Sequence, residues 1–472
     1  MKAIIAGGGT VGSQLAQQLV REGLDVVIVE QNAERARILA NRLDCLVVTG
    51  GCNNLEVLRK ASIEDADFFV AVTTSDEINM IACGLVSSEF HVGTKIARVR
   101  TFDYSSTAIS GKSFLGIDRV VKPELEAARE IVRSVDEGAI SDVFEFRNSP
   151  VQMRPISVLP DSRLAGRSVE EASQWLDASF IIGVIVRNRS YLIPDGTTMI
   201  REGDQLFAVA TDRDFRTIFD KLGKNRKPIE NIVIVGGGKV GRLVLQHLMR
   251  RDQPGLHNDR GGRLGDFFRT RHRRLQVVEQ DYEKCKELSA MFPDILVTNA
   301  DISDESAFQE EHFADADLII STTENQELNM VTALYARTLG VKRSVVLVTN
   351  SSYVSICGQL NIDVAVSLKN AVVDTIVSTI RQGTGEVINS VRSISDGTVE
   401  VLELSVGSGS RVVGRPLYDI RLPHDSLIVS VSRDERAFVP NGDTVLAAGD
   451  IVVAIARHDQ FAKLEKAFKK KS

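Results

Sequence analysis

The feature that most constrains the fold is a glycine-rich phrase that occurs twice. "AIIAGGGTVGSQLAQQL" runs from Ala3 to Leu19, and "IVIVGGGKVGRLVLQHL" runs from Ile232 to Leu248. In each copy an apolar run predicts a β-strand, the G-x-G-x-x-G spacing predicts a tight turn, and the residues that follow predict a helix. The chain is therefore expected to consist of two related halves.

Aligning the two phrases brings the residues after them into register. A second apolar strand ends in an acid followed by glutamine in both halves, at Glu30 and at Glu279. Further on, "ADFFVAVTTSDEINM" matches "ADLIISTTENQELNM", and the step from Glu30 to Asn79 is 49 positions against 50 from Glu279 to Asn329. About one gap is enough over this stretch, which indicates an internal duplication.

The pattern predicts the fold class. Continuous apolar strands that alternate with amphipathic helices are typical of a parallel sheet with helices on both faces, so each half should begin with a Rossmann-like, doubly wound α/β domain. Short strands and turns follow, with "PDG" from Pro194 matching "PNG" from Pro440, and these predict a small α+β module in each half. The expected domains are 1–138, 139–224, 229–385 and 386–472.

A helix follows the fifth strand of each α/β domain, "PELEAAREIVRSV" from Pro123 and "LKNAVVDTIVSTI" from Leu368. In the second, apolar positions recur at the three-and-four spacing of one helix face. Two interpretations are equally consistent with that face. The helix packs on the sheet of its own half, or it crosses over to the other domain.

The glycine turns point to nucleotide binding. At this spacing the first glycine allows the turn, the second lets a pyrophosphate approach the backbone, and the third lets helix and strand pack closely, while the helix N-terminus attracts the phosphates. Glu30 lies 18 residues after Gly12, where an acid accepts hydrogen bonds from ribose hydroxyls and disfavours a 2′-phosphate. NAD or an adenine nucleotide is thus expected over NADP. In the alternative, the glycines serve packing alone and Glu30 caps a loop.

Other recurring residues follow the fourth strand. Thr73 and Thr323 lie at its carboxyl end, where open α/β sheets bind ligands, so they are expected to touch nucleotide unless they only bond within the turn. Asn79 and Asn329 recur at the start of the next helix and are interpreted as structural caps.

The two sites differ in their cations. Arg98 and Arg100 align with Val348 and Asn350, whereas Thr10 aligns with Lys239. Because arginine forms forked, charge-assisted bonds to phosphate, the two sites are hypothesised to prefer different numbers of phosphates. The alternative for both arginines is a surface salt bridge.

The second half also contains an insertion that the first half lacks. The Arg-rich segment 251–274 separates the first helix of this half from its second strand. A solvated surface loop is favoured for it over a docking arm for an acidic partner.

Composition limits the function classes. A net charge of −6 over 472 residues argues against a role in coating nucleic acid or membrane, and the five scattered cysteines predict neither a metal site nor disulfides. The first residues lack the features of a signal peptide, and no apolar run reaches the ~20 residues of a membrane helix.

No catalytic group stands out. None of the seven histidines recurs in both halves, and no acid or base candidate for hydride transfer is found. A sensor is therefore favoured over the alternatives, an NAD-dependent oxidoreductase with duplicated Rossmann domains and a soluble nucleotide-sensing scaffold.

The motifs "GGGTVG", "IVEQ", "VTTSDEINM" and "RVR" in the first half, and "GGGKVG", "VVEQ" and "TTENQELNM" in the second, resemble a known family. With the order of the modules, they are similar to the TrkA family, the regulatory subunits of the bacterial and archaeal Trk potassium-uptake systems, built from tandem RCK domains. The resemblance implies a cytoplasmic, non-enzymatic ring, expected as a homotetramer, under a membrane channel subunit of the TrkH type. Binding of NAD(H), ATP or ADP to this ring would control the opening of the channel.

Carried over by position, the resemblance marks a set of nucleotide contacts in each half. In the first half these are Gly7, Gly8, Gly9, Thr10, Val11, Gly12, Glu30, Thr73, Thr74, Arg98 and Arg100. In the second half they are Gly236, Gly238, Lys239, Val240, Gly241, Glu279 and Thr323.

Overall fold

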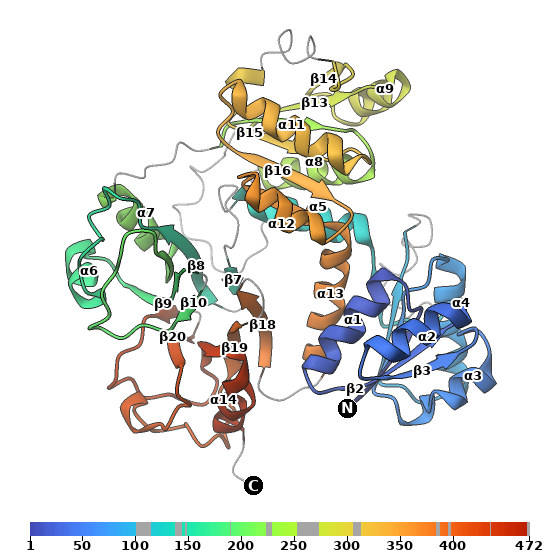
Figure 1. Cartoon of the computed structure of the whole chain (residues 1–472), viewed down its shortest axis with the longest axis horizontal. Coiled ribbons are helices and arrows are strands. Elements are labelled where there is room, and N and C mark those ends of the chain that lie inside the picture. Colours follow the sequence, from blue (N-terminus) through green and yellow to red (C-terminus); the bar gives the residue numbers. More distant parts are fainter. Residues whose placement is uncertain are drawn as a thin grey trace. The chain divides into compact units, whose positions relative to one another are not determined.

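The structure is a computed structural model of the chain that divides into two compact units (Figure 1). It describes residues 1–100, 115–136, 144–146, 149–188, 190–222, 229–252, 273–304, 313–383, 388–394, 398–434 and 436–469. The first unit joins residues 1–141 to 228–380, and the second joins 142–227 to 381–472. Each unit therefore contains one piece from each half of the duplicated chain.

The first unit contains two six-stranded sheets whose strands all run parallel. Their orders, β3-β2-β1-β4-β5-β6 and β14-β13-β12-β15-β16-β17, are those of a doubly wound Rossmann fold, which confirms the predicted fold class. The strands of the first sheet are β1 (Lys2–Ala6), β2 (Asp25–Glu30), β3 (Leu46–Thr49), β4 (Phe68–Ala71), β5 (Thr94–Arg98) and β6 (Arg119–Val121). Those of the second are β12 (Asn231–Val235), β13 (Arg274–Glu279), β14 (Leu296–Asn299), β15 (Leu318–Ser321), β16 (Ser344–Val348) and β17 (Val364–Ser367).

Helices connect these strands. The first domain has α1 (Thr10–Arg21), α2 (Ala33–Arg42), α3 (Leu55–Lys60), the 3-10 helix η1 (Ile63–Asp65), α4 (Asp76–Glu89) and α5 (Pro123–Asp136). The second has α8 (Lys239–Asp252), α9 (Tyr282–Met291), the 3-10 helix η5 (Phe313–Asp315), α11 (Gln326–Thr338), α12 (Ser352–Gln359) and α13 (Leu368–Gly383).

The last helix of each domain packs on the other domain. The buried face of α5, which includes Ala128 and Ile131, belongs to the same core cluster as Val244 of α8. In the reciprocal contact, Ile376 of α13 shares a core cluster with Leu15 of α1, and Figure 1 shows α13 (orange) beside α1 (blue). Of the two interpretations of these helices, the crossover is therefore correct. Although α5 lies within the expected domain 1–138, it contributes to the core of the second domain.

The second unit contains two antiparallel five-stranded sheets with the same internal order, β10-β9-β11-β8-β7 and β21-β20-β22-β19-β18. The strands are β7 (Phe144–Phe146), β8 (Ser149–Ser157), β9 (Phe180–Arg187), β10 (Ser190–Leu192), β11 (Gln205–Thr211), β18 (Ile388–Ile394), β19 (Val399–Ser405), β20 (Ser426–Arg433), β21 (Arg436–Phe438) and β22 (Ile451–Arg457). The helices are α6 (Val169–Leu176), α7 (Asp212–Lys221), η6 (Leu417–Asp419), η7 (His458–Gln460) and α14 (Phe461–Phe468).

The two modules of this unit share one apolar core. Val184 and Phe207 of one sheet belong to the same cluster as Val429 and Ile455 of the other. The sheets approach so closely that a Cβ on Gly183 would lie 2.1 Å from Cδ1 of Ile455. A side chain at position 183 would therefore force the Ile455 side chain to move.

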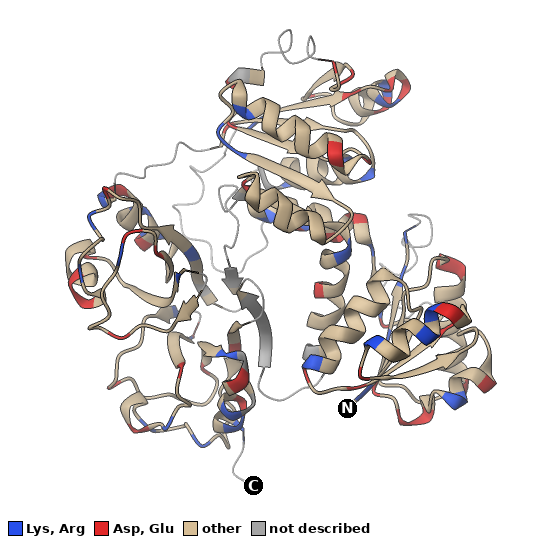
Figure 2. Ribbon diagram, in the orientation of Figure 1, with Lys and Arg blue, Asp and Glu red and all other residues tan. Residues whose placement is uncertain are grey.

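Charged residues are distributed without a dominant sign. Figure 2 shows Lys and Arg interspersed with Asp and Glu in both units, in keeping with the net charge of −6. Among the described residues, no helix has the length and apolar character that a membrane-spanning segment needs.

An ion pair between a partly exposed arginine and a buried aspartate recurs in both small modules. Arg187 donates two hydrogen bonds to Asp204, at 2.8 and 2.7 Å, and Arg433 binds Asp450 in the same bidentate way. Both aspartates are only 1% exposed. Burial by itself would raise the pKa of Asp204, but hydrogen bonds from Arg187 and from the Arg201 N–H outweigh it, so that this pKa lies below its usual value.

This pair makes the stability of the second unit depend on pH. Because the pKa of Asp204 is lower in the folded state, the ion pair stabilises the fold at pH values above the unfolded-state pKa of about 4. This stabilisation is lost as the pH falls through the lower folded-state pKa. We expect R187A to lower the free energy of unfolding at pH 7 by about 2–4 kcal/mol, measured by urea titration, because it leaves a buried carboxylate without its guanidinium partner. R216A removes an exposed pair with Asp212 and should cost less than about 1 kcal/mol. Equal losses for the two variants would contradict this account.

The helix exchange predicts a long-range effect of a core substitution. Ile376 is fully buried against α1, so I376A should destabilise the first nucleotide domain by about 2–5 kcal/mol. We expect amide hydrogen exchange to accelerate in α1, in the other half of the chain. The control is I356A, because Ile356 of α12 is 41% exposed and should leave exchange in α1 unchanged. Acceleration confined to residues 344–383 in I376A would argue against the exchange.

Candidate nucleotide sites at the glycine turns

The two glycine turns lie at the carboxyl ends of β1 and β12 and have the same geometry. Gly7 and Gly236 adopt φ values of +105° and +98°, which favour glycine. A Cβ on Gly12 would lie 1.9 Å from the carbonyl oxygen of Gly7, and one on Gly241 would lie 2.0 Å from that of Gly236. The first and third glycines are therefore required for the turn and for the close packing of helix against strand.

The middle glycine has a different environment in both turns. A Cβ on Gly9 or on Gly238 would meet no atom within 4 Å. Gly9 precedes the first residue of α1 and has φ −67°. This open space above a helix N-terminus is where the fold presents its backbone to an anionic ligand.

The acid at the end of the second strand binds the turn itself. Glu30 accepts hydrogen bonds from the N–H groups of Gly8 and Asn32, both at 2.8 Å. Glu279 does the same with Gly237 and Asp281, at 2.8 and 3.0 Å. The structure thus shows the loop-capping role for both acids. Because each carboxylate oxygen has a second lone pair, the ribose contact stays a prediction.

Asn79 and Asn329 organise the next edge of each site. Asn79 is fully buried; its Oδ1 accepts hydrogen bonds from the N–H and the hydroxyl of Thr73, and its Nδ2 donates to the carbonyl of Arg98 at 2.9 Å. Asn329 makes the matching bonds to Thr323 and to the carbonyl of Leu347. The interpretation of these asparagines as helix caps is wrong, because the caps are Ser75 and Asn325. Each asparagine instead ties the ends of the fourth and fifth strands together.

Arg98 distinguishes the first site from the second. Its side chain lies at the end of β5, is 8% exposed and donates to the carbonyl of Thr73, while its Nε is buried without a hydrogen-bond partner. Burial, and next the nearby charge of Arg100, lower the pKa of Arg98 to about 10. A surface salt bridge is therefore the wrong interpretation for Arg98. The strand pairings and the asparagine hydrogen bonds place Leu347 at the equivalent position, and not Val348 as the alignment of the halves predicts. Leu347 is apolar and 5% exposed.

The residues that follow the fifth strand differ in charge between the sites. The N–H of Arg100 donates to the carboxylate of Asp76 at 2.8 Å, and Asp76 is 8% exposed. In the second site the N–H of Thr349, which the strand register makes the counterpart of Arg100, donates to the neutral side chain of Gln326 at 3.1 Å. The first site thus contains a cation and an anion at positions where the second has neutral side chains.

The remaining predicted contacts fall into two groups. Thr10, Thr74, Arg100 and Lys239 are exposed at the turns or strand ends. Val11 and Val240 are at most 6% exposed and face the core, so only their main chain is available to a ligand. Of the Arg-rich segment 251–274, residues 253–272 lie outside the described part of the chain.

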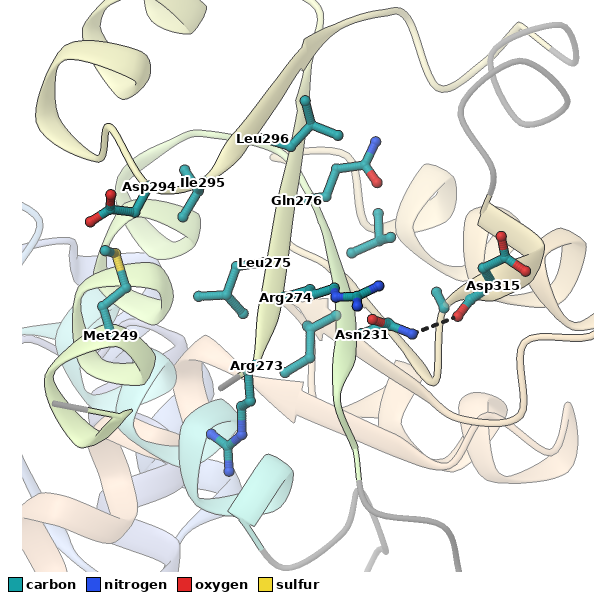
Figure 3. A pocket seen from close by; sticks show the side chains of 13 residues that line it. Asn231, Met249, Arg273, Arg274, Leu275, Gln276, Asp294, Ile295, Leu296 and Asp315 are labelled. Carbon is teal, nitrogen blue, oxygen red and sulfur yellow. Dashed lines mark hydrogen bonds between the residues drawn. The ribbon is translucent and has the colours of Figure 1, made fainter. Parts of the chain in front are cut away.

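A cavity of about 610 Å³ lies elsewhere in the second domain. Figure 3 shows that Asn231, Arg274 and Leu296 line it, together with Asp315. These three residues begin strands β12, β13 and β14, whereas Gly236 follows the opposite end of β12. The cavity therefore lies at the edge of the sheet away from the glycine turn and is no part of the candidate site.

Comparison with known families agrees with this arrangement. The TrkA-N domain family matches residues 3–123 and 255–368, and the TrkA-C domain family matches residues 154–223 and 401–469. The Trk system potassium uptake protein TrkA of Halomonas elongata is 30% identical over 459 residues, which cover 96% of this chain and 95% of the relative. The chain belongs to the TrkA family. A TrkA homologue of Methanosarcina mazei is also 30% identical, over 99% of this chain and all of its own length.

Solved structures support the same fold for this TrkA-family chain. The GsuK channel bound to NAD superimposes with a TM-score of 0.55 at 18% identity, covering 99% of this chain and 78% of the channel chain. The GsuK RCK domain gives the same score and identity over 99% of this chain and 94% of that one. At this identity the likeness shows the fold alone.

The geometry of the turns predicts unequal tolerance to alanine. G12A should destabilise the first domain by about 2–3 kcal/mol, because its Cβ would clash with the Gly7 carbonyl. G9A places its methyl group in open space and should cost less than about 1 kcal/mol. Thermal unfolding of both variants measures the difference. Similar losses would show that the third glycine is not needed for packing.

Proposed function

We propose that this TrkA-family chain is a nucleotide-binding regulatory subunit of a Trk-type potassium-uptake system. The observation that carries the proposal is the pair of equivalent glycine turns, each with open space above its second glycine and with an acid at the end of the neighbouring strand. NAD(H) is the ligand class that this acid favours, and ATP or ADP fit the same turns. The solved GsuK channel, which has the same fold, is described as bound to NAD.

The first site is the better phosphate site in this proposal. Arg98 presents a buried guanidinium whose Nε lacks a partner, at the carboxyl edge of the sheet where ligands of this fold lie. A phosphate beside this guanidinium would balance its buried charge. The second site has the apolar Leu347 at this position, so a ligand there can contact only the turn, the helix N-terminus and the exposed Lys239. The two sites should therefore rank the nucleotides differently.

Such a subunit regulates by differential binding and needs no catalytic residues. Two nucleotides that prefer different conformations shift the equilibrium about tenfold for each ~1.4 kcal/mol of difference, and equal affinities shift nothing. The partner in this proposal is a membrane channel subunit of the TrkH type, and the chain acts at the cytoplasmic face as a homotetrameric ring. The names of its relatives, Trk system potassium uptake proteins, support the partner.

Binding titrations test the nucleotide sites. Wild-type protein titrated calorimetrically with NADH, ADP and ATP should show two classes of site. G9V should remove the first class and G238V the second, because a Cβ at either position meets no atom of the fold within 4 Å and the valine side chain would occupy the space that the ligand needs. R98M should weaken the first class alone by about 10- to 100-fold, since it removes charge-assisted hydrogen bonds. No binding by the wild type, or binding unaffected by G9V and G238V, would refute these sites.

Assembly and turnover separate this proposal from the oxidoreductase alternative. Size-exclusion chromatography with light scattering should give a tetramer, and NADH absorbance at 340 nm should stay constant in the presence of candidate carbonyl substrates. A monomer that consumes NADH steadily with any of them would favour an enzyme.

A further inference from the structure

The contact between α13 and α1 contains a polar cluster beside its apolar core. The side-chain amide nitrogen of Gln14 donates to Oδ1 of Asn370 at 2.8 Å, and the hydroxyl of Ser351 donates to the same oxygen at 2.7 Å. Ser351 also lies 3.5 Å from the amide oxygen of Gln14. We name Gln14, Ser351 and Asn370 the amide cluster. Its members come from α1, from the start of α12 and from α13.

The pseudo-symmetric contact between α5 and α8 has no such amide pair. The glycine alignment pairs Gln14 with Leu243, and the alignment of the two crossover helices pairs Asn370 with Leu125. Leu243 and Leu125 both lie in the apolar cluster that holds α5 on α8. Two leucines are thus enough for packing in the contact between α5 and α8. Packing alone therefore does not explain why the contact between α13 and α1 has amides at these positions.

The amide cluster is connected to the first glycine turn through helix α1. Gln14 lies two residues after Gly12 in the helix whose N-terminus forms the candidate phosphate site. A ligand that draws this helix terminus toward itself therefore also moves the Gln14 amide.

On the other side the amide cluster reaches the second site. Ser351 directly follows Asn350, and the backbone N–H groups of Thr349 and Asn350 both donate to Oε1 of Gln326, at 3.1 and 3.3 Å. Gln326 is the first residue of α11, which begins three residues after Thr323. An unbroken series of hydrogen bonds and short main-chain segments thus joins the two candidate nucleotide sites.

We propose that the amide cluster couples the two nucleotide sites, so that occupancy of the first glycine turn changes the conformational equilibrium of α11 and α12 at the second. Amide hydrogen bonds are directional and have discrete partners, which suits an element with two alternative arrangements. The inference rests on the proposed nucleotide binding. It adds the physical link through which one site senses the other.

Hydrogen–deuterium exchange in a chain with one working site tests the coupling. In G238V, whose second turn is closed, saturating ADP or NADH binds at the first turn alone. We expect amides of α11 and α12 to change their exchange rates by about fivefold or more. Q14L/N370L, which copies the leucine pair of the other half, and N370L alone should both abolish this remote change while the first site still binds.

T375V is the matched control. It removes the 3.3 Å hydrogen bond from Thr375 to Glu126 between the two crossover helices, which lies outside the series that joins the sites. The remote change should persist in it. Coupling is reciprocal in binding free energy, so in G9V a nucleotide at the second turn should also alter exchange in α1.

The outcomes separate the two proposals. If G238V binds neither ADP nor NADH, the proposed first site fails and the inference fails with it. If G238V binds nucleotide but α11 and α12 do not respond, or respond equally in N370L, nucleotide binding stands and the coupling role of the amide cluster is refuted.

Discussion

The exchange of α5 and α13 between the two nucleotide domains is the contact on which the first unit depends. Each helix buries its apolar face on the first helix of the other domain, directly behind a glycine turn. Neither domain therefore completes its core without residues from the other half of the chain. Because packed cores deform in discrete steps, a movement of one first helix is passed on to the crossover helix that covers it.

The duplication keeps the geometry of the turns and changes their charge. The paired glycines have matching φ values and nearly identical close contacts, and the acids at the strand ends make the same backbone hydrogen bonds. Arg98 and Asp76 have no charged counterparts in the second half, where Leu347 and Gln326 take their places. One shared scaffold thus offers two sites of different electrostatic character, which is what a sensor that compares nucleotides requires.

Sequence reasoning predicted the features that are set by local pattern. The strand–turn–helix repeats were enough for the doubly wound sheets, because periodicity and glycine spacing are local properties. The crossover was undecided, since the apolar stripe of α13 is the same whichever sheet it covers. Burial of Arg98 was missed because arginine usually lies at the surface.

Contacts between residues that are far apart in the chain cannot be predicted from local sequence patterns. Asn79 was misjudged because its partners are the ends of two strands and not its own helix terminus. Gln14 and Asn370 are 356 positions apart, and no local signal connects them. The aligned halves do contain one signal for this contact, because Gln14 and Asn370 both align with leucines, Leu243 and Leu125.

The most direct test of the account is potassium flux under nucleotide control. The chain would be reconstituted in proteoliposomes with a TrkH-type membrane subunit, and rubidium uptake would be measured with NADH, ADP, ATP or no nucleotide. The account predicts that flux through the complex depends on which nucleotide is present, and that this dependence disappears in the G9V/G238V variant. Flux that is the same under all four conditions in the wild-type complex would contradict it.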